Sequence, residues 1–176
     1  MLHIPVLLEE SLDFLLNDLS GTYLDLTFGR GSHSKAILSR LSSSAELHAV
    51  DRDLEAVLYA KKHFTDPRFS IFHANYSEVD TLFPIKRFNG ILLDLGTCST
   101  HFDDHSRGFS FQGNGPLDMR MDTTKGFSAA EFLNQASEKE ISEVLYKYGE
   151  EKASRKIAKV IVEHRTKNIF QTTKDL

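Results

Sequence analysis

Three observations predict an α/β fold with a doubly wound parallel sheet, followed by a helical part. Short β-branched or aromatic runs alternate with helical patterns over roughly the first hundred residues, which is typical of successive β–α units. A glycine turn follows the first expected strand, and an aspartate ends the second. Beyond residue 94, a glycine-rich loop precedes three helical patterns. We therefore expect a sheet domain over residues 1–102 and a loop and helical domain over residues 103–176.

The elements of the sheet domain follow from residue patterns. The stretch from Pro5 to Leu16 spaces its leucines as one apolar helical face, which predicts a packing helix. Runs of β-forming residues predict four strands, at Tyr23–Thr27, Leu47–Val50, Phe69–His73 and Gly90–Asp94. Helical spacing predicts helices at Ser34–Leu41 and Leu54–Phe64, and a weaker one after Ser77.

The second part shows start signals for helices. Two Ser-x-x-Glu sequences, beginning at Ser128 and Ser137, have the form of a capping box. A third helix is expected from Glu150 to Arg165, with Ala153, Ile157, Val160 and Ile161 on one face. Thr172 or Thr173 resembles a further N-cap. In the loop, an extended conformation would place Asp118, Arg120 and Asp122 on one face and Leu117, Met119 and Met121 on the other.

The composition excludes several classes of protein. The formal net charge of -4 excludes a surface that is basic throughout. The single cysteine, Cys98, excludes a disulfide framework and a Cys-based zinc finger. No apolar run approaches the ~18 residues of a membrane span, and the N-terminus lacks a signal pattern, so we expect no membrane and a cytoplasmic location. A doubly wound sheet has roughly five or more strands, so four strands in 176 residues predict a truncated chain.

The turn after the first strand is the strongest candidate for a ligand site. Gly29 and Gly31 allow a ligand to approach the backbone, and the next helix offers free N–H groups. Asp51 is placed to accept hydrogen bonds from a ribose, although it could instead cap the following helix. Ser34 replaces the third glycine of GxGxxG, and the carboxylate of Asp25 disfavours a pyrophosphate. S-adenosylmethionine therefore fits better than NAD, and an NAD-dependent oxidoreductase stays an alternative.

Other polar residues are candidates for catalysis or for metal binding. Asp94 ends the fourth expected strand at the same sheet edge as Asp25 and Asp51, so we expect three carboxylates to converge on one crevice, with Asp94 as the candidate catalytic residue. Its alternative role is to initiate a turn. His33 and His101 lack a second ligand at the spacing of zinc sites, so no metal is expected.

Basic residues of the second part are candidates for contacts with RNA. Residues 147–167 carry a balance of +4 and leave -8 on the rest of the chain. This charge is compatible with RNA docking or with an ordinary solvated helix face. Arg107 and Arg120 could contact phosphates or pair with neighbouring aspartates, and their spacing in the sequence does not distinguish these two roles. The candidate RNA contacts are Arg107, Asp118, Arg120, Lys152, Arg155 and Lys156.

Seven sequence blocks occur in order over essentially the whole chain. They are His3-Ile-Pro-Val-Leu-Leu-Glu-Glu10, Asp25-x-Thr-Phe-Gly-x-Gly-x-His-Ser34, Ala49-Val-Asp-Arg-Asp53, Gly90-Ile-Leu-Leu-Asp-Leu-Gly96, Arg107-Gly-Phe-Ser-Phe111, Gly115-Pro-Leu-Asp-Met-Arg-Met-Asp122 and Tyr148-Gly-Glu-Glu151. These blocks resemble the bacterial 16S rRNA cytosine-N4 methyltransferases, which have mitochondrial relatives.

The resemblance implies a Rossmann-like S-adenosyl-L-methionine domain that is interrupted by a helical insertion. It implies methylation of the N4 exocyclic amine of one cytidine in the decoding region of 16S rRNA, within the small ribosomal subunit. A homodimer stays open. The implied cofactor contacts are Gly31, Ser32, His33, Asp51, Tyr76, Asp94 and His101.

Three of these positions depart from the family pattern. Ser32 stands where the family has a second glycine, Tyr76 where it often has phenylalanine, and Cys98-Ser-Thr-His101 where it typically has Ser-Ser-Pro-Gln. The family also continues beyond the insertion with the rest of its sheet. An inactive fragment that binds RNA or cofactor is therefore a further alternative, as is a chain that does not fold stably alone.

Overall fold

The computed structural model describes residues 7–176, and these form two compact units. The first unit is the chain up to Cys98 together with Met121–Thr123. The second unit is Ser99–Arg120 together with Thr124–Leu176. The domain division that the sequence suggests after residue 102 falls within helix α5, Ser99–Asp103.

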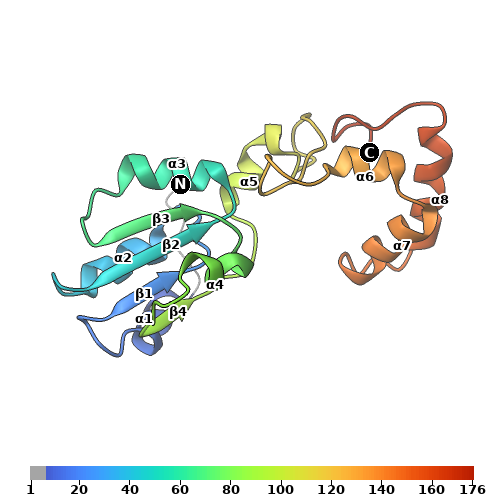
Figure 1. Cartoon of the computed structure of the whole chain (residues 1–176). Coiled ribbons are helices and arrows are strands. Elements are labelled where there is room, and N and C mark those ends of the chain that lie inside the picture. The colour runs from blue at the N-terminus through green and yellow to red at the C-terminus, as the bar shows by residue number, and fades with distance from the viewer. Residues whose placement is uncertain (1–6) are drawn as a thin grey trace. The chain divides into compact units, whose positions relative to one another are not determined.

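A parallel four-stranded sheet forms the first unit, as Figure 1 shows. The strands are β1 (Thr22–Asp25), β2 (Glu46–Asp51), β3 (Phe69–His73) and β4 (Gly90–Leu92), in the order β3-β2-β1-β4. This arrangement confirms the predicted α/β class. The order reverses between β1 and β4, and ligands of doubly wound sheets bind outside the carboxyl ends of the strands at such a point.

Two predicted strands are longer than the observed ones. The first ends at Asp25, because the Asp25 carboxylate accepts the backbone N–H of Thr27 and turns the chain. The fourth ends at Leu92, so Asp94 lies two residues beyond the strand that it was expected to end.

Helices cover both faces of the sheet. On the face that carries Tyr23, Leu47 and Ala49 lie α1 (Leu8–Leu15), α2 (Ser32–Arg40) and α3 (Leu54–His63). On the face that carries Leu24 and Val50 lie residues from the short helix η1 (Tyr76–Glu78) to Phe88, including α4 (Val79–Leu82). The predicted amphipathic helix is α1, whose Leu12 is buried; Pro5, where it was expected to start, lies outside the described residues.

The second unit is helical, with a separate apolar core. It contains α5, η2 (His105–Arg107), α6 (Ala129–Gln135), α7 (Glu138–Lys147) and α8 (Ser154–Arg165). The two predicted capping boxes are confirmed. Each serine side chain accepts the backbone N–H of the glutamate three residues later, and the carboxylate of that glutamate accepts the backbone N–H of the serine. The core consists of Leu117, Leu133, Ile141, Ala158, Ile161 and Phe170.

The third predicted helix differs from α8 in its start and in its buried face. Glu150 adopts a left-handed conformation with φ 52°, and the Glu151 carboxylate accepts the Ala153 N–H, so the helix begins at Ser154 rather than at Glu150. Val160, expected on the apolar face, is exposed, and Ala158 takes the buried position.

The loop before α6 is not the extended segment that the alternation predicted. Met119 has φ 62° and is exposed, so it does not pack beside buried Leu117. Its N–H donates to the Arg107 carbonyl, which folds the loop back on itself. The N-cap predicted at Thr172 or Thr173 is not found within residues 7–176, because Thr172 Oγ1 donates to the Asp175 carboxylate and Thr173 Oγ1 to the Gly113 carbonyl, whereas a cap oxygen accepts a backbone N–H of its own helix. Thr172 pairs as an isolated bridge with Pro116.

Candidate cofactor site

The glycine turn lies at the carboxyl end of β1, where the strand order reverses. Gly29 and Gly31 have φ 56° and 75°, in the left-handed region that favours glycine. A Cβ on Gly31 would lie 2.4 Å from the Phe64 ring and 2.5 Å from the Phe28 ring. The turn therefore requires glycine at position 31 for two independent reasons.

Helix α2 begins directly after this turn. Its first residue is Ser32, two residues earlier than predicted, and Gly31 is its N-cap without a side-chain cap. The first backbone N–H groups of a helix have no carbonyl partner within it. Ser32 and His33 thus belong to a first turn whose N–H groups and dipole favour a carboxylate or another anion.

Asp51 ends β2 and holds the turn in place. One carboxylate oxygen accepts the Gly29 N–H at 2.7 Å, and the other accepts the Asp53 N–H at 2.8 Å. The cap of α3 is Asp53, which accepts the Glu55 N–H at 3.0 Å, so capping is not the role of Asp51.

Asp25 is fully buried beneath the turn. Burial raises the pKa of its carboxyl above the ordinary 3.8, against hydrogen bonds from Ser34 and Thr27 that lower the pKa. Ser34 Oγ donates to it at 2.7 Å. The expectation that the Asp25 carboxylate faces the ligand crevice and disfavours a pyrophosphate is wrong, because this carboxylate is buried and ties α2 to β1 from inside the protein.

The end of β4 is joined to the end of β1 by one hydrogen bond. The Asp94 N–H donates to Thr27 Oγ1 at 2.8 Å, and the Asp94 side chain is exposed. Tyr76 opens η1 directly after β3 and is 43% exposed. In a parallel sheet the carboxyl ends share one edge, so Asp51, Tyr76, Asp94 and the glycine turn all follow strand ends of that edge.

Thr27 and Asp53 are the residues of this edge that sequence reasoning missed. Both residues belong to sequence blocks that resemble the family, close to Gly29 and Asp51. Their roles were missed because Thr27 accepts the Asp94 N–H and Asp53 accepts the Glu55 N–H, and these contacts become visible only in the folded chain.

His101 belongs to the second unit, in α5. It is buried and stacks on Phe109, with ring centroids 5.2 Å apart. The cofactor contact implied for His101 stays a prediction.

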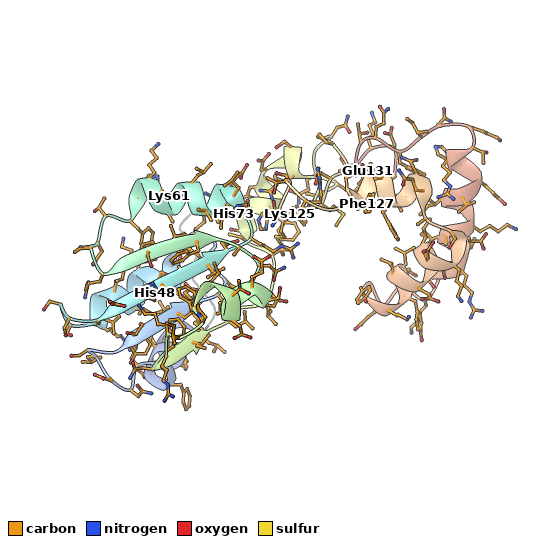
Figure 2. The ribbon with its side chains drawn as sticks, viewed as in Figure 1. His48, Lys61, His73, Lys125, Phe127 and Glu131 are labelled. Carbon is orange, nitrogen blue, oxygen red and sulfur yellow. The ribbon has the colours of Figure 1, made fainter. Side chains whose placement is uncertain are left out.

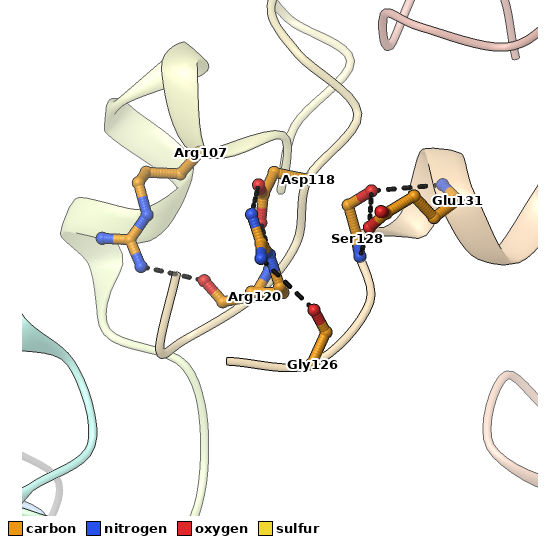
Figure 3. A network of polar contacts seen from close by, with 6 residues as sticks. All are labelled: Arg107, Asp118, Arg120, Gly126, Ser128 and Glu131. Carbon is orange, nitrogen blue, oxygen red and sulfur yellow. Dashed lines mark hydrogen bonds and ion pairs between the residues drawn. The ribbon is translucent and has the colours of Figure 1, made fainter. Parts of the chain in front are cut away.

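Arg107, Asp118 and Arg120 form a polar network in the second unit, shown in Figure 3. Arg120 Nε and Nη2 donate to the two carboxylate oxygens of Asp118 at 2.9 and 2.6 Å. Arg107 is buried and donates from Nη2 to the Arg120 carbonyl at 3.0 Å. Hydrogen bonds from Arg120, with the nearby charge of Arg107, lower the pKa of Asp118. The spacing left phosphate contact and pairing with an aspartate open for both arginines. The structure shows the pairing for Arg120, and a phosphate contact stays a prediction for Arg107.

Lys152 lies in the turn between α7 and α8, Arg155 and Lys156 lie in the first turn of α8, and all three are exposed. Their candidate role as RNA contacts stays a prediction. Within the described range 7–176, no three His, Cys, Asp or Glu side chains group as metal ligands do. No helix in that range has the length and apolar character needed to cross a membrane.

Comparison with known proteins decides the family, because the model of the MraW methylase family matches residues 1–176. The chain belongs to the MraW methylase family. It is 49% identical over 178 residues to a ribosomal RNA small subunit methyltransferase H from Idiomarina loihiensis, with 99% of this chain covered. It is 48% identical over 169 residues to the protein of that name from Methylibium petroleiphilum, with 93% covered. The chain spans 56% and 53% of the lengths of these two relatives.

A solved structure also resembles part of the MraW-family chain. The protein is assigned as an rRNA-methylase from Clostridium thermocellum, at 21% identity and a TM-score of 0.38, with 46% of this chain and 48% of that chain covered. Membership of the MraW family confirms the predicted family, and with it the predicted methyl donor, S-adenosyl-L-methionine.

Proposed function

We propose that the chain carries the cofactor half-site of an S-adenosyl-L-methionine-dependent methyltransferase. The substrate is the N4 amine of a cytidine in the decoding region of 16S rRNA. The observation that carries the proposal is the glycine turn, held by Asp51 at the point where the strand order reverses. The two ribosomal RNA methyltransferases that the chain matches support the RNA substrate.

Each residue of the turn has a role that follows from its position. The Asp51 carboxylate accepts hydrogen bonds from ribose hydroxyls, and Gly31 lets the backbone lie close to the ligand. The N–H groups of Ser32 and His33 face a carboxylate of the methionine part. Tyr76 offers an exposed ring for the adenine. His101 is a further proposed cofactor contact.

The bound cofactor supplies a methyl group on a positively charged sulfur. Asp94 accepts a hydrogen bond from the amine that receives the methyl group, or orients the methionine part, since its side chain is exposed beside the turn. The protein mainly positions the two reactants, because alignment alone supplies a large part of such an acceleration.

The test is calorimetric titration of the 176-residue chain with S-adenosyl-L-methionine and, separately, with NAD. We expect binding of the first and none of the second. Asp51→Ala should weaken binding about 10- to 100-fold, because hydrogen bonds to a charged group are lost. Asp80→Ala, which removes an exposed carboxylate in α4, is the matched control.

The outcomes separate the alternatives. Binding of NAD instead would support the oxidoreductase. Binding of the cofactor without transfer to a 16S rRNA fragment would support the inactive fragment. Equal affinities for Asp51→Ala and the starting chain would contradict the proposed site.

The remaining expectations follow from the proposed substrate. We propose a cytoplasmic location for the protein, and RNA contacts by residues of the second unit. A homodimer stays a prediction.

A further inference from the structure

We propose that the turn between α7 and α8 is a binding surface for an unpaired RNA strand, with Tyr146 and Tyr148 stacking on bases and Lys152, Arg155 and Lys156 contacting phosphates. The inference rests on the proposed function, since it specifies how the RNA substrate meets the second unit. We call these five residues the α7–α8 tip.

Three cations of the second unit already have partners within the protein. Lys147 and Lys159 pair with glutamates one helical turn away, at 3.2 and 3.8 Å. Arg165 donates two hydrogen bonds of 2.7 Å to the carbonyls of Leu133 and Ala136, so it closes the end of α6. These three cations have structural partners.

The tip cations are different. Lys152, Arg155 and Lys156 are exposed, and none forms an ion pair within residues 7–176. They lie in the turn and in the first turn of α8, whose Ser154, Ala158 and Ile161 face the core. A positive group without a carboxylate partner is available to a phosphate.

The two tyrosines of the tip are exposed to solvent. Tyr146, in the last turn of α7, is 63% exposed, and Tyr148, its C-cap, is 83% exposed. Neither ring packs on another aromatic ring of the described residues. Exposed aromatic rings beside cations are the elements with which proteins bind single-stranded nucleic acid, because each base presents a face for stacking.

The backbone keeps these groups at one end of the helix pair. The Glu151 N–H donates to the Leu145 carbonyl at 3.0 Å, and Ser142 Oγ donates to Ser154 Oγ at 3.4 Å, so the turn is tied to both helices. Two carboxylates share the turn. Glu151 accepts the Ala153 N–H, and Glu150 is exposed with φ 52°. Over residues 150–156, three cations stand against two carboxylates, so the tip as a whole carries more positive than negative side chains.

Duplex RNA is a poorer fit. The major groove of an A-form helix is deep and narrow, and stacking on a side chain requires a base that is free of its partner. Two ring faces and three cations therefore match a strand of a few unpaired nucleotides.

The experiment measures fluorescence anisotropy of a labelled single-stranded 12-nucleotide oligoadenylate with the 176-residue chain. Tyr148→Ala and Tyr146→Ala should each weaken binding by about five- to a hundredfold. Tyr148→Phe should bind as tightly as the starting chain, because stacking needs only the ring. The triple variant Lys152→Ala, Arg155→Ala, Lys156→Ala should lower the slope of log K against log salt by about 2.

A matched control removes the same charge elsewhere. Lys61→Ala, Lys62→Ala and Arg87→Ala are exposed changes in the first unit, where Figure 2 shows Lys61 on α3. This variant should keep the oligonucleotide affinity within about twofold. Equal losses in the tip and control variants would overturn the proposal, as would absence of oligonucleotide binding by the starting chain.

Titration of the same variants with S-adenosyl-L-methionine separates the two claims. Intact cofactor affinity in the tip variants shows that the chain is folded. Cofactor binding without any effect at the tip leaves the proposed function standing and ends this inference. Oligonucleotide binding at the tip without cofactor binding would support the tip as an RNA-binding surface and contradict the proposed cofactor site.

Discussion

At the scale of single residues, Gly31 carries the strictest requirement. We expect Gly31→Ala to destabilise the chain by about 1–3 kcal/mol, because a Cβ would force a strained φ and collide with two phenylalanine rings. Urea unfolding measures the loss, and calorimetry should show that cofactor binding is lost with it.

Gly96→Ala is the matched control for this change. Within residues 7–176, no atom beyond the two adjacent residues lies within 4 Å of a Cβ built on Gly96, so we expect an effect on stability within about 0.5 kcal/mol. A Gly31→Ala chain as stable as the control would contradict the argument.

Asp25 should make stability depend on pH in an unusual direction. Its pKa is raised by burial, so its stabilising contribution is complete below the unfolded value near 3.8 and is lost as pH rises through the folded value. Asp25→Asn keeps the shape and can still accept the Thr27 N–H. We expect the variant to be more stable than the original at neutral pH, with the difference closing as the solution is acidified.

The measurement is the urea midpoint of both chains between pH 4 and 8. A difference that stays constant over this range would show that the Asp25 carboxyl does not titrate with unfolding.

At the scale of elements, the Asp118–Arg120 pair shapes the loop that precedes α6. Arg120 also donates to the Gly126 carbonyl at 3.3 Å, so the pair ties both ends of a short loop. We expect Asp118→Asn to destabilise the chain by about 1–3 kcal/mol, since two donors lose a charged acceptor. Because the pKa of Asp118 is lowered, its contribution is present above about 3.8 and is lost as pH falls further.

Chemical unfolding at pH 7 and at acidic pH checks this expectation. Asp80→Asn, an exposed carboxylate of α4, should leave stability within about 0.5 kcal/mol. The effect of Asp118→Asn should shrink on acidification, and an effect that is the same at both pH values would contradict the ion pair.

Elements whose signals are local could be predicted from the sequence. The capping boxes at Ser128 and Ser137 depend on side chains three residues apart, and β3 has the predicted bounds. The start of α8 and the fold of the Met119 loop were predicted wrongly, because both depend on left-handed residues that are not glycine. The burial of Asp25 and the Thr27–Asp94 hydrogen bond were invisible too, since they join segments that are distant in sequence.

At the scale of the whole molecule, β4 presents an exposed apolar edge. Among residues 7–176 it pairs with β1 alone, and Ile91 in the strand and Leu93 and Leu95 directly after it are between 44% and 67% exposed. Such an edge favours pairing with another chain. We expect concentration-dependent self-association, which Ile91→Lys with Leu93→Lys should reduce severalfold.

Light scattering after size exclusion measures the mass of both chains at several concentrations. Leu58→Lys, at an exposed leucine of α3, is the control and should leave association unchanged. Association that survives the β4 changes would place the contact elsewhere, which bears directly on the predicted homodimer.

The hydrogen bond from the Gly29 N–H to Asp51 has a consequence for the thermodynamics of ligand capture. The protein itself orders this loop through the hydrogen bond between Gly29 and Asp51. Ligand binding therefore loses little conformational entropy in the loop. Hydrogen–deuterium exchange should therefore find the Gly29 amide protected to the same extent before and after saturation with S-adenosyl-L-methionine. We therefore expect the glycine turn to keep the same conformation with and without its proposed ligand.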